Sequence, residues 1–245
     1  MYTRQEFEVL RTTEAAKMAA DTTLRRDALD LLVRADKHYW IHQANWMGEP
    51  CLQLPQDLFA LQEIIYQTRP KFIVEVGVAW AGSMLFYATL LESLGEGRVI
   101  GVDIYIPDDL RERVMSHGRV SDRINLIQGS SIEATTLEQV RKATGGAREI
   151  MVHLDSNHTH AHVRKELELF APLVGPGCYL ICGDTIVEDM PESDRPRPWG
   201  KGNNPRTALE DFLKSPDGKN FERDRRFQDK FLFTCNPEGY LRRKA

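Results

Sequence analysis

The chain has 245 residues, 42% of them hydrophobic, which is enough to bury one good core. Its net charge of −4 offers no electrostatic footprint for a nucleic acid, and its longest apolar runs have strand length, far too short to span a bilayer. The first residues are too charged for a signal peptide, and the four cysteines have no framework spacing. We therefore expect a soluble, reduced, cytoplasmic protein that binds neither nucleic acid nor a membrane.

The first part of the chain predicts helices. Residues 3–39 contain no Gly or Pro and alternate apolar with charged positions at helical spacing, which favours one or two amphipathic helices. Isolated helices of this length are marginal in water, so we expect them to pack on the domain or on a second subunit of a homo-oligomer. This helical extension is assigned to residues 1–45 and the main domain to residues 46–245.

Short apolar strands alternate with helices in the main domain. After a bridge over residues 42–55, the pattern predicts a helix over 56–67 that ends before Pro70. The expected strands are 72–76, 98–103, 124–128, 149–155 and 178–182, and the expected helices between them are 82–94, 108–116, 132–143 and 161–173. This repetition predicts an α/β fold, with helices on both faces of a mostly parallel sheet. Cys178 and Cys182 would share one face of the last strand as core residues rather than as disulfide partners.

The last third of the chain follows a different pattern. Residues 184–204 hold much of the proline and glycine and predict a long loop, often a lid or substrate wall in such folds. Asn204 and Pro205 favour a helix start for residues 206–214. Two apolar segments, 230–235 and 240–243, flank a turn and predict an antiparallel hairpin. A seven-stranded, mostly parallel sheet that ends in an antiparallel hairpin is typical of class I methyltransferases.

The stretch Val74–Ser83 carries the strongest sign of a ligand. Small residues just after the first strand let the backbone approach a ligand, and the next helix begins with free amides. Asp103 ends the second strand, where a carboxylate can accept both hydroxyls of a ribose, and Gly129–Ser131 and Asp155 end the next two. Ligands of open α/β sheets bind beyond the carboxyl ends of the strands, so these groups are expected to meet in one crevice.

A nicotinamide enzyme is the main alternative, because Gly77-x-Ala79-x-x-Gly82 approximates the dinucleotide fingerprint. Glu75 lies two residues before the first glycine, where a carboxylate suits the cationic end of a methyl donor rather than a pyrophosphate. The Tyr-x-x-x-Lys spacing of short dehydrogenases occurs only at residues 240–244, the wrong end of the chain. Both features favour S-adenosylmethionine.

Several motifs together resemble the cephalosporin hydroxylase family. They are Trp46-x-Gly48-x-Pro50, Pro55-x-Asp57 with Gln62–Ile65, Val74–Ser83, His153–His158, Gly183–Thr185 and Asn236–Tyr240. The resemblance covers residues 46–240. Despite its name, that family has a Rossmann-like class I methyltransferase fold, includes rhamnosyl O-methyltransferases, and is similar to macrocin-type metal-dependent sugar O-methyltransferases.

The resemblance implies transfer of a methyl group from S-adenosylmethionine to a hydroxyl of a sugar or small natural product, assisted by Mg²⁺. The residues that it implies for the methyl donor are Glu75, Gly77, Ser83, Asp103, Ser130 and Ser131. The residues that it implies for the magnesium ion are Asp155 and Asp184. The chain departs from the family at Ala81 and Gly183, where members often have glycine and glutamate, and at Asn157, where related sugar methyltransferases have a catalytic aspartate.

The chemistry of methyl transfer agrees with these residue types. A sugar hydroxyl is a poor acid, so a cation that holds and acidifies it is useful, and Mg²⁺ commonly takes one or two protein carboxylates. Asp155 and His158 are therefore the catalytic candidates, with His158 as the general base in place of the absent aspartate. The structural alternatives are that Asp155 caps a helix, that Asp184 starts a loop, and that His158 is hydrogen-bonded at a helix start.

Two other functions remain open at this stage. His153-x-Asp155 matches the first half of a two-histidine, one-carboxylate iron site, which would make the protein a hydroxylase. A non-catalytic partner subunit that binds the donor is the second alternative, supported by Gly183 and Asn157. A site of three histidines is not expected, because in a helix that begins near His158, His160 points away from His158 and His162.

Overall fold

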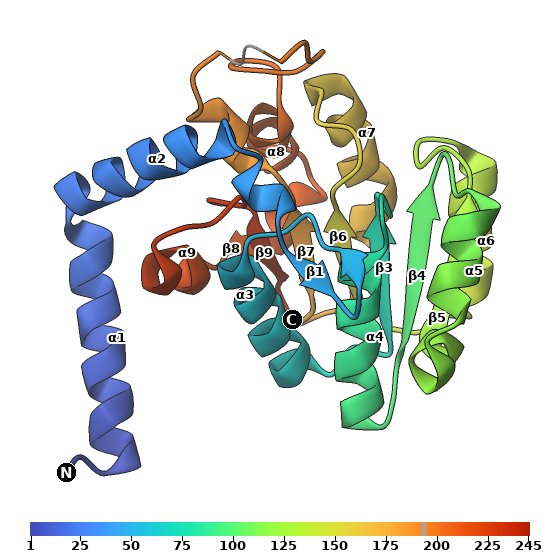
Figure 1. Ribbon diagram of the computed structural model, residues 1–245, viewed down its shortest axis with the longest axis horizontal. Coiled ribbons are helices and arrows are strands. Elements are labelled where there is room, and N and C mark those ends of the chain that lie inside the picture. The colour runs from blue at the N-terminus through green and yellow to red at the C-terminus, as the bar shows by residue number, and fades with distance from the viewer. Residues whose placement is uncertain (193–194) are drawn as a thin grey trace.

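The alternating pattern of strands and helices folds into one seven-stranded sheet with helices on both faces (Figure 1). A computed structural model describes residues 1–192 and 195–245. The strands are β1 (Asn45–Trp46), β2 (Glu49–Pro50), β3 (Phe72–Val76), β4 (Arg98–Asp103), β5 (Ile124–Gln128), β6 (Ile150–Leu154), β7 (Tyr179–Cys182), β8 (Phe221–Arg223) and β9 (Tyr240–Arg243). The helices are α1 (Arg4–Ala20), α2 (Thr22–Asp36), α3 (Pro55–Thr68), α4 (Gly82–Leu94), α5 (Asp108–Met115), α6 (Ala134–Thr144), α7 (His160–Phe170), α8 (Pro205–Phe212) and α9 (Arg226–Phe231).

The sheet has the strand order β5-β4-β3-β6-β7-β9-β8. The first five of these strands pair in parallel, and β9 runs antiparallel to both β7 and β8. The chain moves outward from β3 through β4 to β5 and then returns to the other side of β3 with β6. The order therefore reverses between β3 and β6, and ligands of open α/β sheets bind at such a reversal. The predicted α/β class, with its mostly parallel sheet, is confirmed.

Two apolar layers enclose the sheet. Residues of α3, α4 and α5 pack against one face, where Ile73 lies, and residues of α6, α7 and α8 pack against the other, where Val74 lies. Alternate strand residues thus enter opposite layers, as the pleat requires. Cys178 and Cys182 are buried together in the second layer and form no disulfide, so their prediction as core residues is confirmed.

The antiparallel end of the sheet differs from the predicted hairpin. The expected strand over 230–235 is wrong, because Lys230 belongs to α9 and the following residues are irregular; β8 is the outer strand instead. The apolar side chains of this segment are used elsewhere: Phe233 and Cys235 pack with Leu32 of α2. The backbone N–H of Cys235, which a strand would use in its ladder, donates to the buried carboxylate of Asp57 at 2.8 Å. The two-residue strands β1 and β2 were not predicted.

The two N-terminal helices pack to different extents. Helix α2 buries Ala28 and Leu32 against the domain, as expected of an amphipathic helix, whereas α1 buries no residue and contacts the domain through α9 (Figure 1). The predicted homo-oligomer and the boundary between residues 45 and 46 stay predictions. Within the described ranges, no helix has both the length and the apolar character needed to cross a membrane.

The predicted loop over 184–204 is mostly irregular. It contains a 3-10 turn at Thr185–Glu188 and an isolated bridge between Gly200 and Asn203. Its residues 193–194 lie outside the described residues. The helix predicted after it begins at Pro205, with Asn204 as a capping box residue.

Candidate active site

The loop between β3 and α4 is shaped by close backbone packing. Gly77 has φ +102°, and a Cβ atom there would lie 2.1 Å from the carbonyl oxygen of Asp155. A Cβ atom on Gly82 would lie 2.3 Å from the carbonyl oxygen of Pro50. Both glycines are thus required by neighbouring protein backbone, besides the ligand approach for which they were predicted. Ala81, which stands at a family glycine position, takes φ +65°, a conformation that costs an L-residue about 1 kcal/mol.

Asp103, the expected ribose ligand, lies at the end of β4 and holds this loop. Its Oδ2 accepts hydrogen bonds from the backbone N–H groups of Val78 at 2.8 Å and Ala79 at 3.3 Å, and its Oδ1 accepts one from Tyr105 at 3.0 Å. The carboxylate is partly exposed, so a ribose can share it. The ribose contact stays a prediction, and the structure adds a second role for Asp103 as the anchor of the loop.

Ser131, expected near the adenine, is buried and bonded to a carboxylate that the sequence analysis missed. The Oε1 of Glu166 accepts hydrogen bonds from Ser131 Oγ at 2.5 Å and from Ser156 Oγ at 2.6 Å, and lies 3.1 Å from His162 Nε2. Glu166 is fully buried on α7 between apolar positions. An acid on the apolar face of an amphipathic helix was the signal that could have identified it.

Two cavities meet at the carboxyl ends of β3 and β6. One, of about 300 Å³, contains Asp103, Ser130 and Ser131 in its wall; the other, of about 220 Å³, contains Ser83 and Asp184. Four residues line both cavities: Gly77, Ala79, Asp155 and Ser156. The two cavities thus adjoin to form one crevice, and the residues predicted for donor and metal, except Glu75, lie in its wall.

Glu75 lies beneath this crevice rather than in its wall. Its side chain is 1% exposed, and burial raises the pKa of the carboxyl to about 8, although a hydrogen bond from Ser83 opposes the shift. Its Oε1 lies 3.8 Å from Nδ1 of His153, and its Oε2 has no partner among the described residues. Burial lowers the pKa of His153 to about 4, so this imidazole is neutral and hydrogen-bonds Tyr87 at 2.8 Å.

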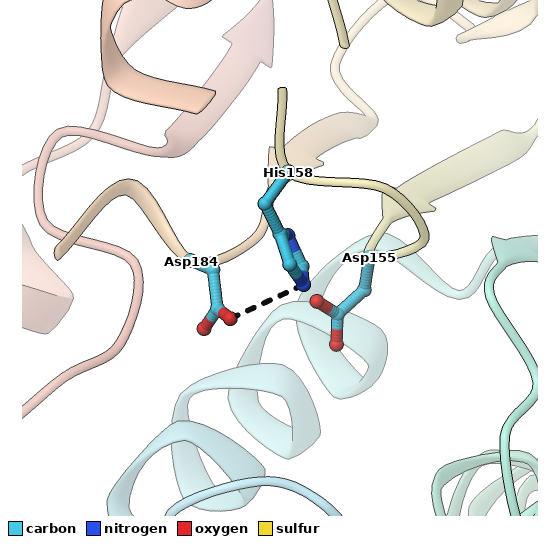
Figure 2. Close-up of side chains that lie close together, drawn as sticks. All are labelled: Asp155, His158 and Asp184. Atoms are coloured by element: carbon cyan, nitrogen blue, oxygen red, sulfur yellow. Dashed lines mark ion pairs between the residues drawn. The ribbon is translucent and has the colours of Figure 1, made fainter. Parts of the chain in front are cut away.

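Asp155, His158 and Asp184 converge on one point (Figure 2). One ligand atom from each lies within 4.8 Å of the others, and His158 Nε2 is 3.4 Å from Asp184 Oδ2. Burial, together with the charges of Asp184 and Glu75, raises the pKa of Asp155 well above its usual range. A cation bound between the two carboxylates would favour the ionised form of Asp155.

Two further residues shape this group. Gln53, which the sequence analysis missed, donates from Nε2 to Asp155 Oδ2 at 2.7 Å; the signal was a lone amide within an apolar run. Gly183 leaves no room for a side chain, because a Cβ atom would lie 2.8 Å from both Leu154 O and Asp155 Oδ1. The glutamate common in the family therefore requires a different local backbone.

The other histidines do not join this group. Helix α7 begins at His160, so His158 precedes it, and His160 bonds Thr207 at 2.9 Å while His162 bonds Glu166. His153 lies under α4, away from the three converging side chains. His158, His160 and His162 thus have different partners: Asp184, Thr207 and Glu166. Among the described residues, the half-site proposed for iron, His153-x-Asp155, does not form a joint cluster.

Comparison with known proteins identifies the family of this chain. The sequence model of the rhamnosyl O-methyltransferase/CmcI family matches residues 37–244. The chain belongs to the rhamnosyl O-methyltransferase/CmcI family. This confirms the resemblance found in the sequence, and with it the enzyme class, S-adenosylmethionine-dependent O-methyltransferase.

The curated relatives of the family share most of their length with this chain. The rhamnosyl O-methyltransferase of Mycobacterium leprae is 29% identical over 220 residues, which cover 86% of this chain and 91% of that protein. The rhamnosyl O-methyltransferase of Mycobacterium tuberculosis is 26% identical, covering 85% of this chain and 84% of that protein.

Solved structures confirm the class I methyltransferase fold. A CmcI structure described as Mg-SAM is 22% identical, with a TM-score of 0.57, and the match covers 83% of this chain and 78% of that one. MycE, a methyltransferase of mycinamycin biosynthesis in complex with Mg, SAH and mycinamycin VI, is 18% identical, with a TM-score of 0.52 over 76% of this chain and 48% of that one.

Proposed function

We propose that this member of the family transfers the methyl group of S-adenosylmethionine to a hydroxyl oxygen of a sugar or small natural product, with Mg²⁺ held beside the acceptor. The observation that carries the proposal is the convergence of Asp155, His158 and Asp184 in the wall of a cavity that also contains the donor-loop residues Gly77 and Ser83. The names of the curated relatives and the bound groups of the CmcI and MycE structures support it.

The two adjoining cavities support a placement for the donor. In the cavity of about 300 Å³, Asp103 is available to the ribose and Ser130 and Ser131 to the adenine. Gly77 belongs to both cavities, so the sulfonium end of the donor passes this residue toward Asp155. Glu75 lies beneath the loop, where its ionised form stabilises the cationic end of the donor.

The donor set fits a magnesium ion. Asp155 and Asp184 offer carboxylate oxygens, which Mg²⁺ prefers, and the pKa of Asp155 is raised mainly by burial and further by the charges of Asp184 and Glu75. When bound, Mg²⁺ holds the acceptor hydroxyl and lowers its pKa. Asp155 and Asp184 would be its protein carboxylate ligands, because Gly183 contributes no ligand and leaves no space for one.

His158 is the proton acceptor in this proposal. Magnesium prefers oxygen to imidazole, so Nε2 of His158 remains available for the proton that the hydroxyl loses. The ring is held edge-on to Trp199, with 4.9 Å between ring centres. The acceptor oxygen bonds to the methyl carbon as the carbon–sulfur bond breaks, giving a methyl ether and S-adenosylhomocysteine.

The part of the acceptor that does not react has space beside the cavity of about 220 Å³, whose wall contains Asp155, His158 and Asp184. A larger cavity, of about 550 Å³, shares Asp36, Val187, Met190 and Arg197 with it. Its walls come from the end of α2 and from the loop after β7, which supports the prediction of that loop as a substrate wall.

The departures from the family pattern have structural explanations and do not favour a non-catalytic subunit. Gly183 is required by the packing of Leu154 and Asp155. Asn157 accepts hydrogen bonds from the backbone N–H of Thr159 at 2.9 Å and from its hydroxyl at 2.7 Å, and so forms a turn immediately before α7. Both residues therefore have a structural role, which supports the catalytic proposal over a subunit that has lost its site.

Incubation with labelled S-adenosylmethionine and a panel of rhamnosides and other glycosides tests this function. We expect label in an O-methyl ether and S-adenosylhomocysteine as the other product. An oxygen-dependent hydroxylated product, or donor binding without transfer to any hydroxyl in the panel, would contradict the proposal.

A further inference from the structure

Asp184 is held in an unusual backbone conformation. Its φ of +51° and ψ of 28° lie in the left-handed region, which L-residues rarely occupy. The glycine beside it, Gly183, does not take the positive φ. The conformation therefore belongs to the residue whose carboxylate faces His158, and something in the surrounding structure must maintain it (Figure 2).

The side chain of Asn236 supplies the contact that maintains this conformation. Its Oδ1 accepts a hydrogen bond from the backbone N–H of Asp184 at 3.0 Å, although the two residues are 52 positions apart in the chain. Asn236 is 1% exposed. Its Nδ2 is buried without a hydrogen-bond partner among the described residues, so the hydrogen bond of this side chain among them is the one that its Oδ1 makes with Asp184.

The turn that carries Asn236 is itself anchored. Asp57 of α3 is 1% exposed and accepts hydrogen bonds from the hydroxyl of Thr234 at 2.5 Å, the backbone N–H of Cys235 at 2.8 Å and the hydroxyl of Tyr240 at 2.8 Å. The hydroxyl of Thr234 accepts in turn from the backbone N–H of Asn236 at 3.0 Å. A continuous chain of contacts thus runs from α3 to Asp184.

We propose that Asn236 is a positioning residue of the active site, which fixes Asp184 in the left-handed conformation and so directs its carboxylate toward Asp155 and His158. The metal-binding role of the Asp184 carboxylate rests on the proposed function, whereas the hydrogen bond between Asn236 and Asp184 does not depend on that function. The C-terminal turn of residues 234–240 then belongs to the metal-binding apparatus, although it supplies no ligand. Partners that orient metal ligands in this way typically change metal affinity 10- to 100-fold.

The test compares Asn236→Ala with Thr185→Val. Thr185 lies next to Asp184, and its hydroxyl donates to the carbonyl oxygen of Pro237 at 2.6 Å, so its valine variant removes a bond between the same two segments without touching the N–H of Asp184. Two quantities are measured on the full chain with S-adenosylhomocysteine present: amide hydrogen exchange of residues 183–187, and binding of Mn²⁺ by electron paramagnetic resonance.

In Asn236→Ala we expect the Asp184 amide to exchange at least about tenfold faster and the Kd for Mn²⁺ to rise about tenfold or more. Thr185→Val should change the Kd for Mn²⁺ less than about twofold, and Asn236→Asp, which keeps the acceptor oxygen, should retain slow exchange at Asp184. If Asn236→Ala does not fold, Asn236→Ser takes its place, because its side chain is too short to reach.

Unchanged exchange and Mn²⁺ affinity in the Asn236 variant would overturn the inference. So would an equal loss of affinity in Thr185→Val, because the effect would then be a general loosening of the two segments. If the wild-type chain binds no Mn²⁺, the proposed metal-assisted function fails, and hydrogen exchange still decides whether Asn236 fixes Asp184.

Discussion

The two halves of the crevice differ in how their polar groups are satisfied. On the donor side, Asp103 already binds backbone amides of the loop, and Ser131 already binds Glu166. On the side of β6 and β7, Asp155 and Asp184 face each other and His158, and the pKa of Asp155 is raised. The donor side is therefore preformed by protein contacts, whereas the other side stores electrostatic repulsion that a cation relieves. Substitutions should affect the two halves separately.

The largest effect is expected from Asp184→Ala. Loss of a metal ligand should lower kcat at least about a hundredfold, because the cation contributes several kcal/mol to the transition state. Affinity for S-adenosylhomocysteine, measured by calorimetry, should change less than about twofold. Asp189→Ala is the matched control, since Asp189 is a nearby exposed acid that pairs with Arg206. Equal losses of donor affinity and turnover in Asp184→Ala would show that the two halves are not separate.

The next largest effect is expected from His158→Ala. Removal of the proton acceptor should slow turnover about a hundredfold at pH 7, and the defect should shrink at higher pH as the hydroxyl loses its proton without help. Metal binding should persist, because His158 is not a ligand in this account. His160→Ala, which removes an imidazole bonded to Thr207, should behave like the wild type. A loss of Mn²⁺ binding in His158→Ala would instead make His158 a metal ligand.

On the donor side, Asp103→Ala should weaken S-adenosylhomocysteine binding about tenfold to a hundredfold, since hydrogen bonds to a charged group contribute about 1.5–3 kcal/mol. Part of this loss comes from the loop, because the amides of Val78 and Ala79 lose their acceptor. Mn²⁺ affinity should remain within about twofold of the wild type. Tighter binding of nicotinamide dinucleotide than of S-adenosylmethionine would contradict the assignment of the donor side of the crevice to S-adenosylmethionine.

The smallest expected effect is the release of protons when the donor binds, not a change in a rate. With a pKa of about 8, the Glu75 carboxyl is mostly protonated at pH 7, and a bound cationic donor should lower that pKa and release up to about one proton. Calorimetry of S-adenosylmethionine binding in buffers of different ionisation enthalpy counts it. Glu75→Gln should remove the release, whereas Glu92→Gln, which alters an acid that pairs with Arg123, should not. The same proton count in Glu75→Gln and the wild type would exclude Glu75 as its source.

The parts of the fold that the sequence predicted are those with local patterns. Buried parallel strands such as β3 and β6 are near-continuous apolar runs, and the helix after Asn204 has its own start signal. The outer strand was misassigned because residues 230–235 are as apolar as a strand. Their partners, Leu32 and Asp57, are distant in the sequence, and no local pattern contains them.

Prediction of the candidate site was limited in the same way, because contacts between residues distant in the sequence have no local pattern. Asp103 and Asp155 were predicted because polar residues at strand ends of a parallel sheet meet, whereas Asp184 was implied by the family resemblance. Gln53 and Glu166 were not predicted, and Asn236 appeared only within a family motif without a role, since each acts through a contact formed only in the folded chain. The steric need for Gly183 was also invisible, because it arises from the neighbouring strand β6.

The dependence of methyl transfer on a divalent cation tests the central claim most directly. Turnover of an accepted glycoside should be measured in excess chelator and again after Mg²⁺ is restored, for the wild type and for Asp155→Ala. The account predicts that chelation abolishes transfer in the wild type, that Mg²⁺ restores it, and that Asp155→Ala is inactive in both conditions while still binding S-adenosylhomocysteine. Full activity in chelator would contradict it and would leave proton removal to His158 alone.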